Sequence, residues 1–291
     1  MPPICPSCLT GTLHTTDPLG HTRTIHGLDT YIAQPPNKTT PKGLIILISD
    51  AFGWTIPNSR LLADAYAQKG GFEVWVPDFM DGYAMSPSVM TRMKELKAPQ
   101  PWLTTLFLKP VWAVQTLYAT VLWLFKTRTS VCKPRIFNFI TQIRKEAPPF
   151  ATDELKIGVA GFCWGGRHAF LLAADEAASR VERYGSSTGK PEALIDCAFV
   201  AHPSMLVLPR EVEEVRVPMS VCVGEEDAMM TREQVGEMKR VLEGKGENEV
   251  ITIEGAVHGF AVRSDPGDGF MVECAEIAER QALGWFQRWM G

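Results

Sequence analysis

A cysteine set between glycines is the residue of this sequence best suited to nucleophilic chemistry. The stretch VAGFCWGGRHAF, residues 159–170, passes from an apolar strand pattern through Cys163 into an apolar helix pattern. Gly161 precedes the cysteine by two residues, and Gly165 and Gly166 follow it. A strand, a tight Gly-x-nucleophile-x-Gly turn and a helix together form a nucleophile elbow, which has no room for side chains at the flanking positions. The helix would direct its amino terminus at the sulfur, where positive partial charge favours the thiolate.

Two further residues could complete a catalytic triad. Asp227 follows the apolar run VPMSVCVG, and His258 follows the next such run, NEVITIEG. Asp227 comes 64 residues after Cys163, and His258 comes 31 residues after Asp227, in the chain order nucleophile, acid, histidine. Loops at the carboxyl ends of parallel strands form the site in open sheets. We therefore predict that His258 takes the thiol proton and that Asp227 orients the imidazole.

Each of these residues also has a purely structural interpretation. Cys163 could be a buried cysteine in a glycine-rich turn, and the histidine could be a polar loop residue. Asp227 could cap a helix that begins near Thr231, and its neighbours Glu225 and Glu226 could serve as the acid instead. The coincidence of three suitable positions in the right order favours the triad.

The elements that must position these residues alternate between strands and helices. Apolar runs predict strands buried on both faces at 44–50, 72–78, 154–161, 194–202, 217–224 and 248–255. Helical patterns fall between them, at 58–71 (with Asn58 as N-cap), 165–181, 231–243 and 268–289. Repeated strand–helix–strand units predict an α/β fold with a mostly parallel sheet and helices on both faces. The loops at 35–43 and 184–191 are short, so we expect a single domain over residues 1–291.

The segment 83–150 breaks this alternation. Within it, residues 111–125 carry no charge. A membrane-spanning helix needs about 20 apolar residues, whereas this run is shorter and contains Gln115 and two threonines. We therefore expect no membrane partner. The segment is predicted to be an apolar helical insertion that forms a buried helix, a lid over the site or the interface of a homodimer.

Composition and charge exclude further classes of function. The 291 residues are 45% hydrophobic and 21% charged, which is typical of a globular protein. A net charge of −4 and an isoelectric point near 5.9 argue against a nucleic-acid partner. The amino-terminal residues have no basic start followed by an apolar stretch, so we expect a cytoplasmic protein.

The cysteines indicate neither a disulfide framework nor a metal site. Their number, seven, is odd, and Cys197 and Cys222 lie in apolar strand patterns, as small buried residues of a reducing compartment do. Cys5 and Cys8 form one C-x-x-C with His14 as a lone third candidate, but a structural zinc site needs four ligands. We therefore expect no metal.

These motifs resemble those of the dienelactone hydrolase family. The matching residues are Gly161-Phe-Cys163-Trp-Gly165-Gly166, Gly224-Glu-Glu-Asp227 and His258-Gly-Phe-Ala-Val-Arg263. The similarity spans roughly residues 25–290, and the early stretch GTLHTTDPLGHTRTIHGLDTYIAQPP is similar to fungal members. A cysteine elbow is fairly specific, since most α/β-hydrolases use serine. The resemblance implies the α/β-hydrolase fold, a Cys-His-Asp triad and no cofactor.

The resemblance also implies roles for residues beside the triad. The family has an acidic residue near the cysteine, commonly glutamate, and here that position is Asp50. A carboxylate there disfavours a second negative charge and would keep Cys163 protonated until substrate arrives. Alternatively, Asp50 caps the loop or accepts a hydrogen bond from a local backbone N–H. The oxyanion hole would be formed by the backbone N–H groups of Trp164 and Ala51.

Substrate binding is expected to involve Arg263, which the family pattern suggests as a partner for a substrate carboxylate. Phe52 and His202 are further candidate substrate-binding residues, and the alternative for His202 is a hydrogen-bonded structural histidine. A second family arginine falls where this chain is least similar; Arg92 is one candidate for it, but the interpretation of Arg92 as a solvated surface arginine is favoured. The apolar segment 102–125 favours a bulkier or less charged substrate than the small lactone of the family's type member.

The function expected from these observations is hydrolysis of a small ester or lactone through a thioester on Cys163. The alternative is a biosynthetic enzyme, for example of fungal secondary metabolism. It would use the same triad for acyl transfer, cyclisation or dehydration of a polyketide-like intermediate. A binding protein on the same fold is disfavoured because the triad is intact.

Overall fold

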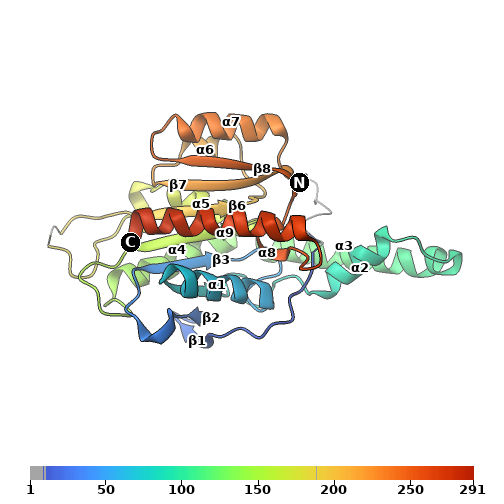
Figure 1. Cartoon of the computed structure of the whole chain (residues 1–291), viewed down its shortest axis with the longest axis horizontal. Helices are drawn as coiled ribbons and strands as arrows, with labels where there is room; N and C mark the ends of the chain where they lie inside the picture. Colours follow the sequence, from blue (N-terminus) through green and yellow to red (C-terminus); the bar gives the residue numbers. More distant parts are fainter. Residues whose placement is uncertain (1–8, 10, 188) are drawn as a thin grey trace.

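A mixed sheet of eight strands forms the centre of the molecule (Figure 1). The computed structural model describes residues 9, 11–187 and 189–291, so the C-x-x-C of Cys5 and Cys8 lies outside the described residues. In spatial order the strands are β1 (His21–Ile25), β2 (Leu28–Ala33), β4 (Glu73–Pro77), β3 (Leu44–Ile48), β5 (Ile157–Phe162), β6 (Cys197–Ala201), β7 (Met219–Glu226) and β8 (Glu249–Val257). β2 is antiparallel to both of its neighbours, and the strands from β4 to β8 are parallel. This is the predicted α/β-hydrolase architecture.

Helices cover both faces of the sheet. One face carries α1 (Pro57–Gly70), α8 (Phe260–Arg263) and α9 (Gly269–Met290). The other carries α4 (Thr129–Lys145), α5 (Trp164–Ala173), α6 (Arg210–Glu213) and α7 (Arg232–Glu243). Short 3-10 turns, η2 (Pro36–Lys38) and η4 (Ala177–Ser179), lie in connections.

Strand β3 shows why the sheet separates two apolar cores. Its side chains alternate between faces, so Leu44, Ile46 and Ile48 join one core while Ile45 and Leu47 join the other. All five are buried. A continuous apolar run is therefore what a central strand covered on both sides requires.

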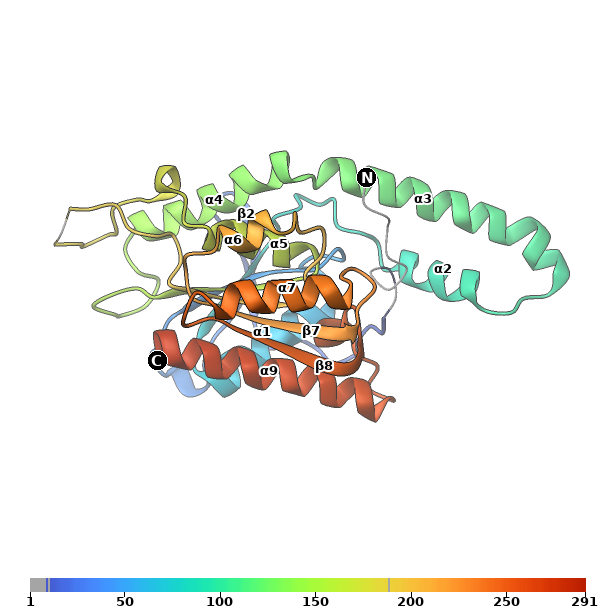
Figure 2. The same cartoon turned by 90° about the horizontal axis from the view of Figure 1, so that it is seen from above.

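The segment predicted as an insertion divides into two parts. Helix α4 buries one side against the sheet, through Cys132, Ile136, Phe139, Ile140 and Ile143, and is the crossover between β4 and β5. Residues 88–128, here called the helical arm, project from the body (Figure 2). The arm contains α2 (Ser88–Lys97), a π-helical turn η3 (Thr104–Leu108) and α3 (Lys109–Lys126). None of the helices in the described part of the chain is long and apolar enough to cross a bilayer.

The structure corrects three details of the sequence-based prediction. Strands β1 and β2 were not predicted, because β1 is exposed along most of its length and has no apolar run. The helix predicted to reach residue 181 ends at Ala173. Asn58 is not the N-cap of α1, which is Ile56; its side chain instead donates to the carbonyls of Thr12 and Val262 at 2.9 Å each.

The parallel strands bring the predicted triad to one edge of the sheet. Cys163 directly follows β5, His258 directly follows β8, and Asp227 directly follows β7. The carboxyl ends of parallel strands meet at the same edge, so residues far apart in the sequence become neighbours there.

The turn at Cys163 is possible because α5 lies against the chain that leaves β3. A Cβ atom on Gly165 would lie 2.0 Å from the carbonyl oxygen of Ile48 and 2.7 Å from that of Ser49. A Cβ on Gly161 would lie 2.7 Å from the carbonyl oxygen of Gly165. Backbone cannot yield as a flexible side chain can, so both positions require glycine.

Gly165→Ala is expected to destabilise the fold by about 3 kcal/mol or more, since the new methyl group overlaps backbone oxygen. Urea unfolding would measure the loss. The matched control is Gly284→Ala in α9, where a Cβ meets nothing within 4 Å and helix propensity favours alanine. Equal stability of the Gly165→Ala variant and the parent would contradict the packing described here.

Candidate active site

Cys163 occupies a backbone conformation that few residues other than glycine adopt. Its φ is 51° and its ψ is −111°. Its N–H donates to the carbonyl of Ala201, and its carbonyl accepts from the N–H groups of Gly166 and Ser204 at 3.1 and 3.0 Å. Such a conformation costs on the order of 1–3 kcal/mol and persists only where the surroundings fix it. The side chain is 2% exposed, at the amino end of α5.

Asp227 and His258 form a buried pair beside this corner. Nδ1 of His258 lies 2.9 Å from both carboxylate oxygens of Asp227, and neither side chain is exposed. The backbone N–H of Met229 donates to Oδ1 of Asp227 at 2.8 Å and fixes the carboxylate further. The pairing leaves Nε2 as the ring nitrogen available for proton transfer.

The other acid candidates lie in different surroundings. The side chains of Glu225 and Glu226 pair with Arg232 at 3.3 and 3.1 Å. The N-cap of α7 is Thr231, which forms a capping box with Gln234, so Asp227 is not the cap of that helix. The carboxylate of Asp227 is thus the one directed at His258.

The pKa of His258 reflects a charged partner on each side. Burial alone would lower it, but the Cys163 thiolate, hydrogen bonds to Asp227 and Cys163, and the Asp227 charge together raise it to about 10. The imidazolium is therefore retained through neutral pH and is lost as the pH rises through about 10. The arrangement stabilises a thiolate–imidazolium pair, the activated form of a cysteine nucleophile.

Ser204 is a site residue that the motif analysis missed. Its hydroxyl lies 3.6 Å from the sulfur of Cys163, within hydrogen-bonding range for sulfur, and its side chain is buried. It follows β6, the strand adjacent to β5. The signal in the sequence was only its place after a predicted strand, because no catalytic motif includes it.

Asp50 and Arg263 form a second buried pair next to the cysteine. Nε of Arg263 lies 2.9 Å from Oδ2 of Asp50, and both side chains are at most 1% exposed. The pKa of Asp50 is raised overall. Burial is the main cause and the charge of Cys163 adds to it, while the charge of Arg263 opposes both. The guanidinium also lies over the ring of Phe52, 5.1 Å from its centroid. Binding of a substrate carboxylate by Arg263, as predicted from the sequence, would have to compete with Asp50.

The residues predicted for the oxyanion hole lie on the two segments that meet at the elbow. Trp164 is the first residue of α5, so its N–H has no acceptor within the helix. Ala51 follows Asp50 in the loop after β3. The carbonyl groups of Ile48, the last residue of β3, and of Ser49 pack against Gly165. The close contact of loop and helix holds both segments beside Cys163.

His202 packs behind the triad histidine. Its ring is fully buried, 5.0 Å from the ring of His258 and 5.3 Å from that of Phe260. Burial, together with the charge of His258, lowers the pKa of His202 well below its usual value, so the ring is neutral. A neutral ring in this position packs against His258 and has no exposed surface.

The family of the chain follows from comparison with known sequences. A sequence model described as "Dienelactone hydrolase family" matches residues 28–290. The match includes the elbow, Asp227 and His258, and extends from β2 into α9. The chain belongs to the dienelactone hydrolase family. It is therefore a hydrolase with the fold that the resemblance implied.

Curated relatives of this dienelactone hydrolase family member are distant but match it along its length. "Dienlactone hydrolase 1" of Gibberella moniliformis is 24% identical over 288 residues, which cover 97% of this chain and 93% of the relative. "Hydrolase pyvD" of Aspergillus violaceofuscus is 25% identical, over 97% of this chain and 96% of the relative. "Carboxymethylenebutenolidase homolog" of Mus musculus is 23% identical, over 94% of this chain and 92% of the relative.

A solved structure agrees with the fold. A putative dienelactone hydrolase from Klebsiella pneumoniae superposes with a TM-score of 0.63 at 16% identity, covering 94% of this chain and all of that one. At this level of identity the likeness concerns the fold, and the chemistry has to be argued from the residues themselves.

An apolar cavity adjoins the elbow of this family member. Its volume is about 630 Å³, and its lining includes Trp164, Leu124 and the run Met205–Leu208, next to Ser204. The side chain of Arg167 in its wall is held by Glu211, with Nη2 2.7 Å from Oε1. Burial and the charge of Arg167 lower the pKa of His168 to about 3, so that ring is neutral. The guanidinium of Arg128, also in the lining, donates to the carbonyl of Phe125, so both arginines of the cavity have partners and the cavity is suited to a group with little charge.

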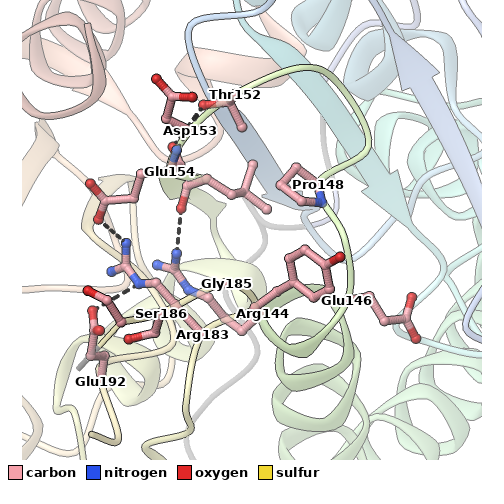
Figure 3. A pocket seen from close by; sticks show the side chains of 13 residues that line it. Arg144, Glu146, Pro148, Thr152, Asp153, Glu154, Arg183, Gly185, Ser186 and Glu192 are labelled. Carbon is pink, nitrogen blue, oxygen red and sulfur yellow. Dashed lines mark hydrogen bonds and ion pairs between the residues drawn. The ribbon is translucent and has the colours of Figure 1, made fainter. Parts of the chain in front are cut away.

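Another cavity lies far from the triad, near the amino end of β5 (Figure 3). Its volume is about 330 Å³, and Arg144 and Arg183 lie in its wall. Arg183 pairs with Glu154 and Glu192, and Arg144 donates to the carbonyl of Leu155. These charges neutralise one another, which is typical of a structural network. Among the described residues, no cluster of His, Cys, Asp and Glu side chains could hold a metal ion.

Asp227→Asn is expected to lower the pKa of His258 without unfolding the protein. Without the carboxylate, the positive charge beside Cys163 is less favourable, so the half-maximal pH for alkylation should rise by on the order of one unit. Iodoacetamide alkylation, followed by mass spectrometry of the Cys163 peptide across a pH series, measures this shift. The control is Glu226→Gln, which should leave the profile unchanged. A large effect of Glu226→Gln with a mild effect of Asp227→Asn would transfer the acid role to Glu226.

Asp50→Asn is expected to destabilise the protein by about 3–5 kcal/mol, because it leaves the buried charge of Arg263 without its counterion. Chemical unfolding measures the loss. The double variant Asp50→Asn/Arg263→Gln removes both charges and should recover part of it. If Asp50→Asn alone had no effect on stability, the pair would not be a structural ion pair.

Proposed function

We propose that this protein hydrolyses a small ester or lactone through a thioester formed on Cys163. The observation that carries the proposal is the buried arrangement of thiol, imidazole and carboxylate at the carboxyl edge of the sheet. The names of the relatives, a dienlactone hydrolase and carboxymethylenebutenolidase homologues among them, are consistent with this class of substrate.

The first half of the reaction forms the acyl-enzyme. The Cys163 thiolate attacks the acyl carbon, a C–S bond forms, and the carbonyl electrons move to oxygen. The N–H groups of Trp164 and Ala51 stabilise that oxyanion, each contributing about 2.7–4 kcal/mol if correctly directed. When the intermediate collapses, the C–O bond breaks and the alkoxide takes the proton of the His258 imidazolium. In a lactone the released alcohol stays attached to the acyl group.

The second half consumes water. Neutral His258 takes a proton from a water molecule, which attacks the thioester carbon, and collapse of this intermediate releases the acid and restores the thiolate. Asp227 keeps the imidazole in one tautomer and stabilises its charged form in both halves. Asp50, paired with Arg263, lies close enough to the sulfur for its charge to oppose the thiolate, whereas the His258 imidazolium stabilises the thiolate.

The substrate class proposed is an apolar ester or lactone with little charge. The cavity beside Trp164 and Met205 is lined largely by apolar side chains, and Arg167 is already paired with Glu211. Arg263 is paired with Asp50, so we expect the site to bind a dicarboxylate less tightly than a neutral acyl group. Arg92, the candidate for the second family arginine, lies on α2 in the helical arm.

Cys163→Ala is expected to abolish turnover of activated esters such as p-nitrophenyl acetate while the fold is retained, since alanine is smaller than cysteine. The parent should also gain a covalent acyl adduct at Cys163, located by mass spectrometry. The matched control is Cys274→Ala, another buried cysteine, in α9. Turnover by the Cys163→Ala variant at the parental rate would reject the nucleophile.

Product analysis separates hydrolysis from acyl transfer. With water as the acceptor the free acid accumulates, and added alcohols or amines change the product only in proportion to their chemical reactivity. Strong preference for one added acceptor over water would instead favour a biosynthetic acyl transfer.

A further inference from the structure

The helical arm presents its apolar side to solvent. In α3, Val111, Val114, Leu117, Tyr118 and Phe125 are all exposed, with Val114 at 66% and Tyr118 at 70%. Trp102, Leu106 and Phe107 extend the same surface toward the tip of the arm and are exposed as well. Apolar surface of this extent is unusual on a monomer and marks an interaction site.

The inner side of α3 is formed by Trp123 together with two threonines. Thr116 and Thr120 are buried there, and the hydroxyl of Thr120 donates to the carbonyl of Thr116 at 2.7 Å. A helix on the surface of a protein in water is normally apolar toward the core and polar outside, whereas α3 is apolar on its outer side as well. The outer face of α3 is therefore built for contact with an apolar phase.

The charge of the arm contrasts with that of the rest of the chain. Residues 88–128 contain six basic residues and one acidic residue, whereas the remainder contains 23 basic and 32 acidic residues. No Asp or Glu occurs between Glu95 and Glu146. Lys109 and Lys126 begin and end α3, and Lys94 and Lys97 are exposed on the neighbouring α2. A positive, apolar arm thus projects from an acidic body (Figure 2).

We propose that the helical arm binds the surface of an anionic phospholipid bilayer, with α3 lying in the plane of the interface. Its apolar face would enter the boundary between headgroups and acyl chains, while lysine amines reach the phosphates. At 1.5 Å per residue, α3 would cover roughly 27 Å of membrane surface. The negative body would be repelled by the same surface, so the charge distribution also orients the molecule.

A second copy of the chain fits this face less well. Phe107, Val111, Val114, Tyr118 and Val121 follow the alternating four- and three-residue spacing of a helix–helix seam. A symmetric pair of arms would, however, bring the basic residues of both copies together without a carboxylate between them, because Glu95 is the sole acid of the arm. An anionic surface supplies the opposite charge that a second copy lacks.

Vesicle sedimentation tests the proposal with the full-length protein. The parent should sediment with vesicles of phosphatidylcholine and phosphatidylserine, bind pure phosphatidylcholine vesicles much more weakly, and be released by salt. Lys94→Glu/Lys97→Glu should lower the affinity for the anionic vesicles roughly thirtyfold or more. The matched control is Lys239→Glu/Arg240→Glu on α7, which should bind like the parent. Failure of the parent to sediment with the anionic vesicles would overturn the proposal.

The apolar face is tested by Val114→Asp/Tyr118→Asp, which should abolish vesicle binding and leave ester turnover unchanged. The control Leu19→Asp/Tyr184→Asp adds the same charge at exposed apolar positions outside the arm and should bind normally. Equal loss in both variants, or no loss in the arm variant, would contradict the proposal. Light scattering without vesicles measures the oligomeric state. If the parent is a dimer and the arm substitutions make it a monomer, the apolar face is the interface with a second copy instead.

Discussion

The tight contact between the first turn of α5 and the chain leaving β3 is the constraint on which the site depends. It brings backbone carbonyls so close to Gly165 that no side chain fits, and it forces Cys163 into a positive φ. The same contact places Trp164 beside the loop that carries Asp50 and Ala51. The proposed nucleophile, the proposed oxyanion donors and Asp50 thus lie on two segments that this packing holds together.

Alternating charges hold this corner together in a site nearly closed to water. Asp227 faces His258, which faces Cys163, and Asp50 faces Arg263. Each buried charge costs several kcal/mol in lost hydration, so each needs a partner of opposite sign. The neutral ring of His202 adds no further charge to this cluster, which is consistent with its lowered pKa. Charge balance therefore limits substitution here as strongly as packing does.

The sequence was sufficient to predict features that depend on local pattern. The strand β3 is a continuous apolar run, and the glycines around Cys163 meet a steric demand that can be read from spacing alone. The pairing of Asp50 with Arg263 could not be read in this way, because it joins residues over 200 positions apart through the geometry of α8. Ser204 was missed for a similar reason: its hydroxyl approaches the sulfur only because β5 and β6 are neighbours. Strand β1 lacked an apolar pattern because an exposed edge strand does not need one.

The root of the helical arm touches the elbow directly. The indole N–H of Trp164 donates to the carbonyl of Thr127 at 3.1 Å, and the indole of Trp123, one turn earlier, contacts the sulfur of Met80. A displacement of α3 that broke this hydrogen bond would act on Trp164, whose backbone N–H is a proposed oxyanion donor. Linkage requires that such an effect be reciprocal: a ligand that repositions Trp164 changes the free energy of the arm by the same amount. The hydrogen bond between Trp164 and Thr127 thus joins the base of the helical arm to the helix that begins beside the proposed nucleophile.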